Sequence, residues 1–475
     1  LPPLALHVPD NAVLVVCASK TNPAYTALAQ LSPSQLGLPR MVFVVDRTGI
    51  DTTVTSLREA LASVHPGTVF VRLSDADICS ILLSDRPEPA KDTLRAAIAA
   101  QCDVEIITPY RTDGVGITDE FPESFIGRQQ ELNLLADRYK QNFLLVGPRR
   151  MGKSSLLHAF RREMKRTHPE VLVLNYWFSS SSLAKIHAVD ERLCADTPDA
   201  FYESVLKRAS VHQLFLLDEA DAFIEQESRS QFGFCHVMRA LSGQGRASFL
   251  LTGYRQLHDA VRTPEHPLRN FGELLRLAPL DLESAEKLIV EPLSAMRLIM
   301  EDPAQTVEWL QRETACRPHL LAYSCLALLR LRRPLGPPPL SLSEVQRAVY
   351  ACAAIRDDFG NWDAQTGQSL VDALVLRAAV ILQRSSVGDL CAFLAKMGAP
   401  LSASDVEFSV NRLYDFHYAL IVDAEGMISC PLPLFIHHLL GRQYADHTAE
   451  TREILERQLT RDITAWRVSP LGQSI

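Results

Sequence analysis

The clearest hydrophobic pattern in the chain begins at residue 143. Residues 143–146 are all apolar without alternation, which is typical of a parallel strand covered on both faces. Gly147 follows at once, and residues 154–165 then carry Leu156, Leu157 and Phe160 at helical spacing. The pattern predicts a buried strand, a glycine-containing loop and a helix in direct succession.

Two more apolar runs follow downstream. The run at residues 214–217 is followed directly by Asp218 and Glu219, and the run at residues 247–251 is followed by Thr252. A shorter run at 171–175 precedes them, with helical patterns between the runs. Strands that alternate with helices predict a mostly parallel sheet with helices on its faces, which is an α/β fold.

The first hundred residues repeat this alternation on a smaller scale. Apolar, β-branched runs at 12–19, 41–46 and 69–73 alternate with helical patterns at 25–31, 54–64, 75–83 and 89–101. We predict a small N-terminal α/β, Rossmann-like domain. Its acids near strand ends are more typical of solvated positions than of a binding site.

In the C-terminal part the hydrophobic pattern is mostly helical. Helical patterns cover 370–381, 387–397 and 402–416, and apolar runs at 419–422 and 427–430 flank a turn at Asp423–Gly426. Three helices and a hairpin predict a winged-helix domain. Its third helix carries Asp405, Glu407 and Asp415 against Arg412, so a regulatory role is favoured over DNA binding. The adjacent His437 and His438 are predicted on a helix surface, not in a metal site.

Proline-rich and glycine-rich segments at 108–123 and 332–343 separate these parts. The predicted organisation is an N-terminal domain at 1–107, a linker at 108–123, a core at 124–275, a helical lid at 276–345, and a winged helix with a C-terminal helix at 346–475.

Composition narrows the function classes. The 475 residues carry a formal net charge of −8, which gives no general attraction to nucleic acid or anionic membrane. The 10 cysteines lie singly, as expected of buried thiols in a reducing cytoplasm. Neither a signal peptide nor a membrane span is predicted, and because residue 1 is Leu, an upstream segment stays open.

The loop after the first strand carries the candidate chemistry. Gly147, Gly152, Lys153 and Ser154 complete the pattern G-x-x-x-x-G-K-S. Such a loop turns backbone N–H groups toward phosphate oxygens, and the next helix directs its positive end at them. Lys153 would contact the β and γ phosphates, and Ser154 would hold Mg²⁺. The predicted contact set is Gly147, Pro148, Arg149, Arg150, Met151, Gly152, Lys153, Ser154 and Ser155; the alternative is a structural loop of similar sequence.

The acids after the second run suit nucleotide hydrolysis. Asp218 can hold the Mg²⁺ shell, and Glu219 can orient or deprotonate the attacking water. The alternative is a strand that ends in solvated acids. Thr252 is a candidate for contact with the γ-phosphate or the water, or for a plain helix cap. Asp221 receives no role.

The motifs in order resemble those of AAA+ and STAND-class ATPases, and most closely the archaeal-type, or novel STAND, group. The resemblance rests on Phe125 to Glu131, Gly147 to Ser155, Leu216 to Asp221, Leu251 to Gly253, and 267–280, and on the segment Arg317-Pro-His-Leu-Leu321, which is similar to the lid motif of this group. Cys316 stands where that motif usually has glycine.

The resemblance implies an ATP-gated switch with nucleotide between core and lid. It places Phe125, Ile126 and Gly127 against the adenine and Pro318 in the lid contact, and it makes Arg269 a candidate to act in trans in a nucleotide-dependent homo-oligomer. It implies ATP and Mg²⁺ as cofactors, slow or partner-stimulated hydrolysis, and by analogy a role in prokaryotic defence or signalling. The alternative is a DNA-binding initiator or transcription regulator that acts through the winged helix.

The first prediction tests the phosphate loop. Lys153→Ala removes a charged hydrogen-bond donor to phosphate, so ATP affinity is expected to fall by about 10-fold to 100-fold. Titration with labelled ATP measures this. A variant that binds ATP as tightly as the parent would show that the loop has another role.

Overall fold

The computed structural model describes most of the chain. The described residues are 13–17, 41–46, 69–84, 89–90, 93–94, 97, 110, 125–177, 187–188, 197–207, 211–295, 298–331, 339–366, 370–440 and 449–468. The chain divides into two compact units. The first comprises Leu1–Tyr110, Ile289–Thr306 and Ser324–Val349, and the second comprises Arg111–Leu288, Val307–Tyr323 and Tyr350–Ile475.

The first unit contains a three-stranded parallel sheet in the order β1-β2-β3. Its strands are β1 (Val13–Cys17), β2 (Met41–Asp46) and β3 (Val69–Leu73), and α3 (Asp75–Leu82) follows β3. The three predicted strands and the helix after them are thereby confirmed. The helices predicted at 25–31 and 54–64, and most of that at 89–101, lie outside the described residues.

The second unit is built on a six-stranded sheet in the order β6-β5-β7-β8-β4-β9. All neighbouring pairs are parallel except β5 with β6. The strands are β4 (Phe143–Val146), β5 (Leu172–Trp177), β6 (His187–Ala188), β7 (Gln213–Asp218), β8 (Ala247–Gly253) and β9 (Glu273–Arg276). The predicted mostly parallel α/β sheet is confirmed, and β8 lies between β4 and β7.

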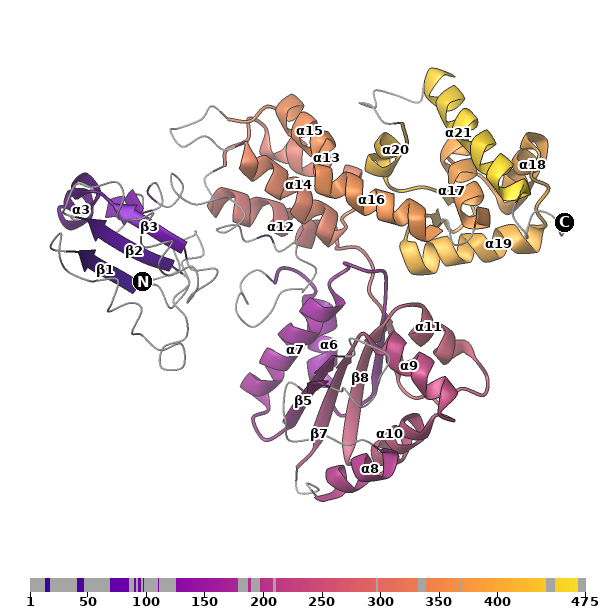
Figure 1. Cartoon of the computed structure of the whole chain (residues 1–475), viewed down its shortest axis with the longest axis horizontal. Coiled ribbons are helices and arrows are strands. Elements are labelled where there is room, and N and C mark those ends of the chain that lie inside the picture. The colour runs from indigo at the N-terminus through magenta and orange to yellow at the C-terminus, as the bar shows by residue number, and fades with distance from the viewer. Residues whose placement is uncertain are drawn as a thin grey trace. The chain divides into compact units, whose positions relative to one another are not determined.

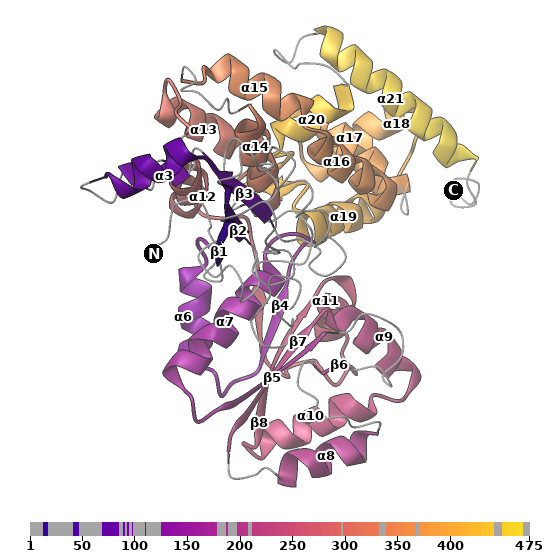
Figure 2. The same cartoon turned by 60° about the vertical axis from the view of Figure 1, so that its left-hand side comes forward.

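Helices cover both faces of this sheet (Figures 1 and 2). One face carries α6 (Gln129–Asp137) and α7 (Lys153–Thr167); the other carries α8 (Pro198–Lys207), α9 (Ala220–Arg229), α10 (Gly233–Gly243) and α11 (Arg255–Arg262). Successive side chains of a strand point to opposite faces. Phe143 and Leu145 therefore join the core under α7, and Leu144 and Val146 join the opposite core.

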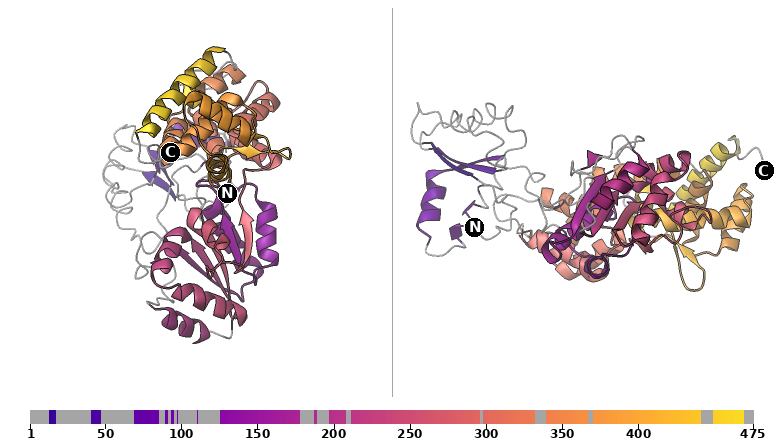
Figure 3. Two further views of the ribbon diagram at one scale, coloured as in Figure 1. Left: turned by 90° about the vertical axis from the view of Figure 1, so that its right-hand side faces the viewer. Right: turned by 90° about the horizontal axis from the view of Figure 1, so that it is seen from below.

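That two-sided burial is the physical reason for the unbroken apolar runs in the sequence. Every residue of β4, β7 and β8 is buried. The Phe215 and Phe249 rings from adjacent strands stack with centroids 5.1 Å apart. Figure 3 shows this sheet and its flanking helices from two further directions. The polar residues Glu123 and Ser124, followed by Leu132, Leu134 and Leu135, predict a helix that begins at 123 or 124. This expectation is wrong, because the first core helix begins at Gln129 and Phe125 to Gly127 form a loop before it.

In the described residues between 282 and 351, four helices follow the core. They are α12 (Leu282–Ala295), α13 (Pro303–Thr314), α14 (Pro318–Arg330) and α15 (Leu342–Ala351). Ala315 and Cys316, in the turn between α13 and α14, have positive φ of 47° and 53°. A left-handed backbone at Cys316 is the physical reason why glycine suits this position.

The C-terminal part contains α16 (Ala353–Thr366), α17 (Leu370–Leu382), α18 (Val387–Met397), α19 (Ala403–Arg412), the π-helical segment η4 (Leu413–His417), the hairpin β10 (Ile421–Val422) and β11 (Ile428–Ser429), α20 (Pro433–Leu440) and α21 (Ala449–Arg467). The three predicted helices and the hairpin are present, and Gly426 in the turn has φ of 76°.

Two details of this part differ from expectation. The third helix changes to a π-helix at Leu413, where helical periodicity alone predicts continuation. His437 is buried rather than on a helix surface, with its ring 3.9 Å from that of Tyr350. Among the described residues no cluster of acids, histidines and cysteines is arranged to hold a metal ion. Within the same residues, no helix combines the length and apolar character that crossing a membrane requires.

Candidate nucleotide site

The predicted phosphate loop joins the carboxyl end of β4 to the start of α7. Gly152 stands at the helix N-cap with φ of 90°, and no side chain caps that end. The first N–H groups of α7 can therefore serve an anion. Gly147 is also closely packed, because an added Cβ would lie 3.0 Å from the Leu277 carbonyl oxygen, which is tighter than an ordinary contact.

Lys153 points back into the loop. Its Nζ donates to the carbonyl oxygens of Gly147 and Pro148, both at 2.8 Å. Burial lowers the pKa of Lys153, and the carboxylates of Glu219 and Asp218 offset part of that effect. A buried ammonium inside a turn of backbone donors is well placed to receive phosphate oxygens.

The side chains of the remaining loop residues differ in burial. Met151 and Ser155 are buried, Ser154 is half-buried in the first turn of α7, and Arg149 is exposed. Arg150 has φ of 62°. Its guanidinium donates to the Tyr323 hydroxyl at 2.7 Å and to Asp358 Oδ1 at 2.6 Å. The Arg150 side chain thus ties the loop to α14 and α16, which the sequence did not indicate.

The acid pair lies at the carboxyl end of β7, beside the end of β8. Leu217 pairs with Leu251, so Asp218 and Thr252 are the next residues on neighbouring strands. The Thr252 hydroxyl donates to Asp218 Oδ1, and the Glu219 N–H donates to the same oxygen at 3.0 Å. The structure thus brings Thr252 and the acid pair together at this edge.

Glu219 is oriented differently from Asp218. It has φ of 56° and is exposed, whereas Asp218 and Thr252 are buried. Desolvation, followed by the charge of Asp218, raises the pKa of the Glu219 carboxyl. A raised pKa brings a carboxylate closer to the range that suits a general base. Glu219 can therefore reach a water molecule while Asp218 stays fixed.

The donor set fits Mg²⁺ through its chemistry. A serine hydroxyl in the first turn of α7 and a carboxylate at the end of β7 are the oxygen ligands that Mg²⁺ prefers, and Mg²⁺ usually takes its other ligands from water and phosphate. Ser154 and Asp218 are the residues that would hold it. The expected chemistry of the ion is neutralisation of phosphate charge.

The segment predicted to contact adenine precedes α6. Phe125, Ile126 and Gly127 are half-buried. Gly127 has φ of 81°, and an added Cβ would lie 2.8 Å from Ser284 Cβ. The next residue, Arg128, is buried and donates to the carbonyls of Met151 and Ala278. Arg128 therefore fixes this segment against the phosphate loop.

The predicted lid motif lies at the start of α14. Pro318 begins the helix, and Arg317 before it is buried. Burial lowers the pKa of Arg317 to about 10, and its Nη2 donates to the carbonyl oxygen of His417 in η4. The sequence motif contains Arg317 but does not indicate this contact.

Arg269 lies away from the phosphate loop of its own chain. It is exposed and precedes β9, whose first residue pairs with Phe143 at the start of β4. In parallel strands the amino ends share one edge and the carboxyl ends the other. Arg269 is therefore at the edge opposite the site, and its action in trans stays a prediction.

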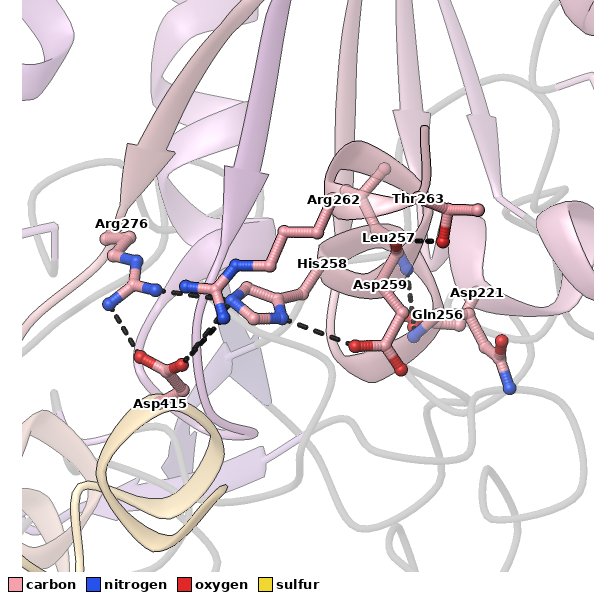
Figure 4. Close-up of polar contacts among 9 residues, drawn as sticks. All are labelled: Asp221, Gln256, Leu257, His258, Asp259, Arg262, Thr263, Arg276 and Asp415. Carbon is pink, nitrogen blue, oxygen red and sulfur yellow. Dashed lines mark hydrogen bonds and ion pairs between the residues drawn. The ribbon is translucent and has the colours of Figure 1, made fainter. Parts of the chain in front are cut away.

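The segment η4 makes a second set of contacts that the sequence did not reveal (Figure 4). Asp415 Oδ1 lies 2.7 Å from Arg276 Nη1, and its Oδ2 lies 3.4 Å from Arg262 Nη1. The side chain of Asp415 is only 9% exposed. Arg276 also donates to His258 Nε2 at 3.2 Å. One carboxylate of the C-terminal part is therefore held by α11 and β9.

His417 extends the contact to the beginning of α11. Arg255 donates to its Nε2 at 3.0 Å, and the Tyr254 hydroxyl lies 3.4 Å from its Nδ1. Burial, followed by the charges of Arg255, Arg317 and Arg412, lowers the pKa of His417 to about 3. The ring is therefore neutral in the folded chain at physiological pH.

Comparison with known proteins gives the fold class. No family model matches the chain, and no curated protein matches it. Among solved structures, the Walker-type ATPase PABY2304 of Pyrococcus abyssi has a TM-score of 0.50 at 17% identity, over 66% of this chain and 95% of its own. The ORC2 protein of Aeropyrum pernix, solved in ADPNP–ADP complexes, has a TM-score of 0.50 at 13% identity, over 75% and 98%.

These similarities, together with the loop after β4 and the strand order of the sheet, show that the chain has an α/β P-loop fold like that of these two proteins. The α/β fold class predicted from the sequence is confirmed.

The second prediction concerns pH. His417 has a pKa of about 3 when folded against 6.5 when unfolded, so between these values the unfolded chain binds the extra proton. Stability is therefore full above pH 6.5 and falls as pH decreases. From pH 7.5 to 5.5 the loss is about 1.4 kcal/mol. Thermal unfolding of the parent and of His417→Gln at both pH values measures it.

The variant should lose less stability on acidification than the parent. His236→Gln, at an exposed position on α10, is the matched control and should behave as the parent. Equal pH dependence in His417→Gln and the parent would contradict the prediction.

Proposed function

We propose that the protein is an ATP- and Mg²⁺-binding switch of the STAND or AAA+ type that hydrolyses ATP slowly. The observation that carries the proposal is the position of η4. Through Asp415 it contacts α11 and β9 of the core, and through His417 it contacts Arg317 at the start of α14. Because η4 contacts both the core and the start of α14, a nucleotide that changes the distance between these two parts would change the contacts of η4.

Two further observations support nucleotide as the trigger. The phosphate loop is itself tied to α14 and α16, because Arg150 binds Tyr323 and Asp358. His319 Nε2 binds the other oxygen of Asp358 at 3.0 Å. A phosphate in the loop would therefore act on a network that reaches the predicted lid. The names of the two structural neighbours, one a Walker-type ATPase and one with bound ADPNP and ADP, agree with this.

Hydrolysis is assigned to the groups at the sheet edge. Lys153 would hold the β and γ phosphates, Thr252 the γ-phosphate or the water, and Glu219 would take the proton of the attacking water. The buried Asp218 would hold the Mg²⁺ shell and fix Thr252 by its hydrogen bond. Defence or signalling remains the proposed setting, by analogy with the resembling group.

The electrostatics of the C-terminal part do not favour the DNA-binding alternative. Arg412, the basic residue of α19, donates to the buried Asp372 and lies over the Phe408 ring. Arg384 is paired with Asp423 and Glu425 of the hairpin turn. These guanidinium groups are engaged by the protein's own carboxylates, whereas phosphate contact requires them to face outward. We therefore propose a regulatory winged helix.

The third prediction tests the switch. Glu219→Gln removes the base but not the phosphate contacts, so ATP affinity should stay within about threefold of the parent, while phosphate release should fall by about 10² to 10⁴. In this variant, hydrogen exchange of residues 413–417 should differ between bound ATP and bound ADP.

Glu225→Gln, on an exposed turn of α9, is the matched control for turnover and should release phosphate like the parent. Lys153→Ala should remove the difference in exchange between the two nucleotides. Identical exchange of residues 413–417 with ATP and with ADP would contradict the proposed switch.

The fourth prediction concerns assembly. The exposed Arg269 can reach only another subunit's phosphates, because it lies at the edge opposite its own loop. Light scattering of Glu219→Gln should show a larger species with ATP than with ADP, and Arg269→Ala should abolish it. Arg229→Ala, a change at an exposed site on α9, is the control. A constant monomer mass in all samples would remove the oligomer from the proposal.

A further inference from the structure

Asp221 lies in the first turn of α9, two residues after Glu219, and its carboxylate is bound to the start of another helix (Figure 4). Its Oδ2 accepts the Tyr254 N–H at 2.6 Å, and its Oδ1 accepts the Gln256 N–H at 2.7 Å. The Leu257 N–H lies 3.4 Å from the same Oδ1. The Asp221 carboxylate therefore accepts hydrogen bonds from three backbone N–H groups at the amino end of α11.

This contact replaces a local cap. The N-cap residue of α11 is Tyr254, and no side chain of the helix itself caps that end. The first N–H groups of a helix need acceptors, and a carboxylate there also gains from the helix dipole. Gly253 makes the approach possible, because an added Cβ would lie 3.0 Å from Asp221 Oδ2 and 2.7 Å from Leu257 Cβ.

The contact also fixes the strand end that carries Thr252. The Thr252 hydroxyl donates to Asp218 and lies 3.3 Å from the Glu219 nitrogen, which donates to it. Two residues further on, Tyr254 is bound to Asp221. The segment between β7 and α9 thus holds the end of β8 at two points, since Asp218 binds Thr252 and Asp221 binds Tyr254. Glu219 lies between these two acids in the sequence.

We infer that Asp221 is a positioning residue for ATP hydrolysis, because it holds Thr252 in register with Glu219 through the backbone at the start of α11. The inference rests on the proposed function. It differs from a simple capping role in one respect: the loss on substitution passes through Thr252 and affects turnover more than nucleotide affinity.

The experiment compares Asp221→Asn with Glu225→Gln, which removes a carboxylate on an exposed turn of the same helix. In the full chain, hydrogen exchange of residues 253–257 should accelerate by about tenfold in Asp221→Asn, because the NH₂ group of Asn cannot accept the backbone N–H that one carboxylate oxygen of Asp221 accepts. ADP affinity should stay within about threefold, while single-turnover hydrolysis should fall by about 10-fold to 100-fold. Glu225→Gln should match the parent in all three.

A double-mutant cycle tests whether Asp221 acts through Thr252. If Asp221 acts through Thr252, then Asp221→Asn combined with Thr252→Ala should be no slower than Thr252→Ala alone. A double variant whose loss is the product of the two single losses overturns the inference, as does unchanged exchange of residues 253–257 in Asp221→Asn.

The remaining outcomes separate the two claims. A parent that binds no ATP defeats the proposed function itself. A parent that binds ATP without hydrolysing it overturns the positioning role in hydrolysis, and a parent that hydrolyses ATP while Asp221→Asn keeps full turnover overturns the inference alone.

Discussion

The candidate site depends on one constraint, the insertion of β8 between β4 and β7 in a parallel sheet. Parallel strands end at a common edge, so the phosphate loop, the acid pair and Thr252 emerge side by side, although Gly147 and Thr252 are 105 positions apart in the sequence. The buried faces of the strands hold this order through two separate cores. Polar chemistry at the edge is therefore positioned by apolar packing beneath it.

Polar groups at that edge satisfy one another. Thr252 is fully buried, yet its hydroxyl binds Asp218, and the buried Lys153 binds loop carbonyls. Burying such groups without partners would cost about 1–3 kcal/mol each. The site is thus assembled in advance, and α11 connects it to η4 because Tyr254 and Arg255 lie at one end of that helix and Arg262 at the other.

Periodicity and motif spacing were sufficient to predict the strands, the loop and the residues at the edge of the sheet. An unbroken apolar run indicates a strand that is buried on both faces, and the fixed spacing of the glycines and Lys153 indicates the backbone geometry of the loop. These signals lie within a few adjacent residues. Lys153, Asp218 and Thr252 could be selected for that reason.

The contacts of Arg150, Arg317, Asp415 and His417 could not be predicted in this way. Each joins residues that are far apart in sequence, and a single acid or histidine on a helical pattern has the same local appearance whether it is solvated or buried. The π-helical end of the third helix follows the same rule, since its residues keep a helical pattern. The contacts of Asp221 are equally invisible to sequence patterns, because its partners are backbone amides.

The burial of Arg317 has a consequence for how strongly η4 is held. Removing a guanidinium from water costs several kcal/mol, and the hydrogen bond to the His417 carbonyl offsets part of that cost. Separation of the two segments would rehydrate the cation and recover that cost. The attached and separated forms are therefore closer in free energy than an apolar interface of equal size would make them, so a modest difference in ligand affinity is enough to redistribute the chain between them.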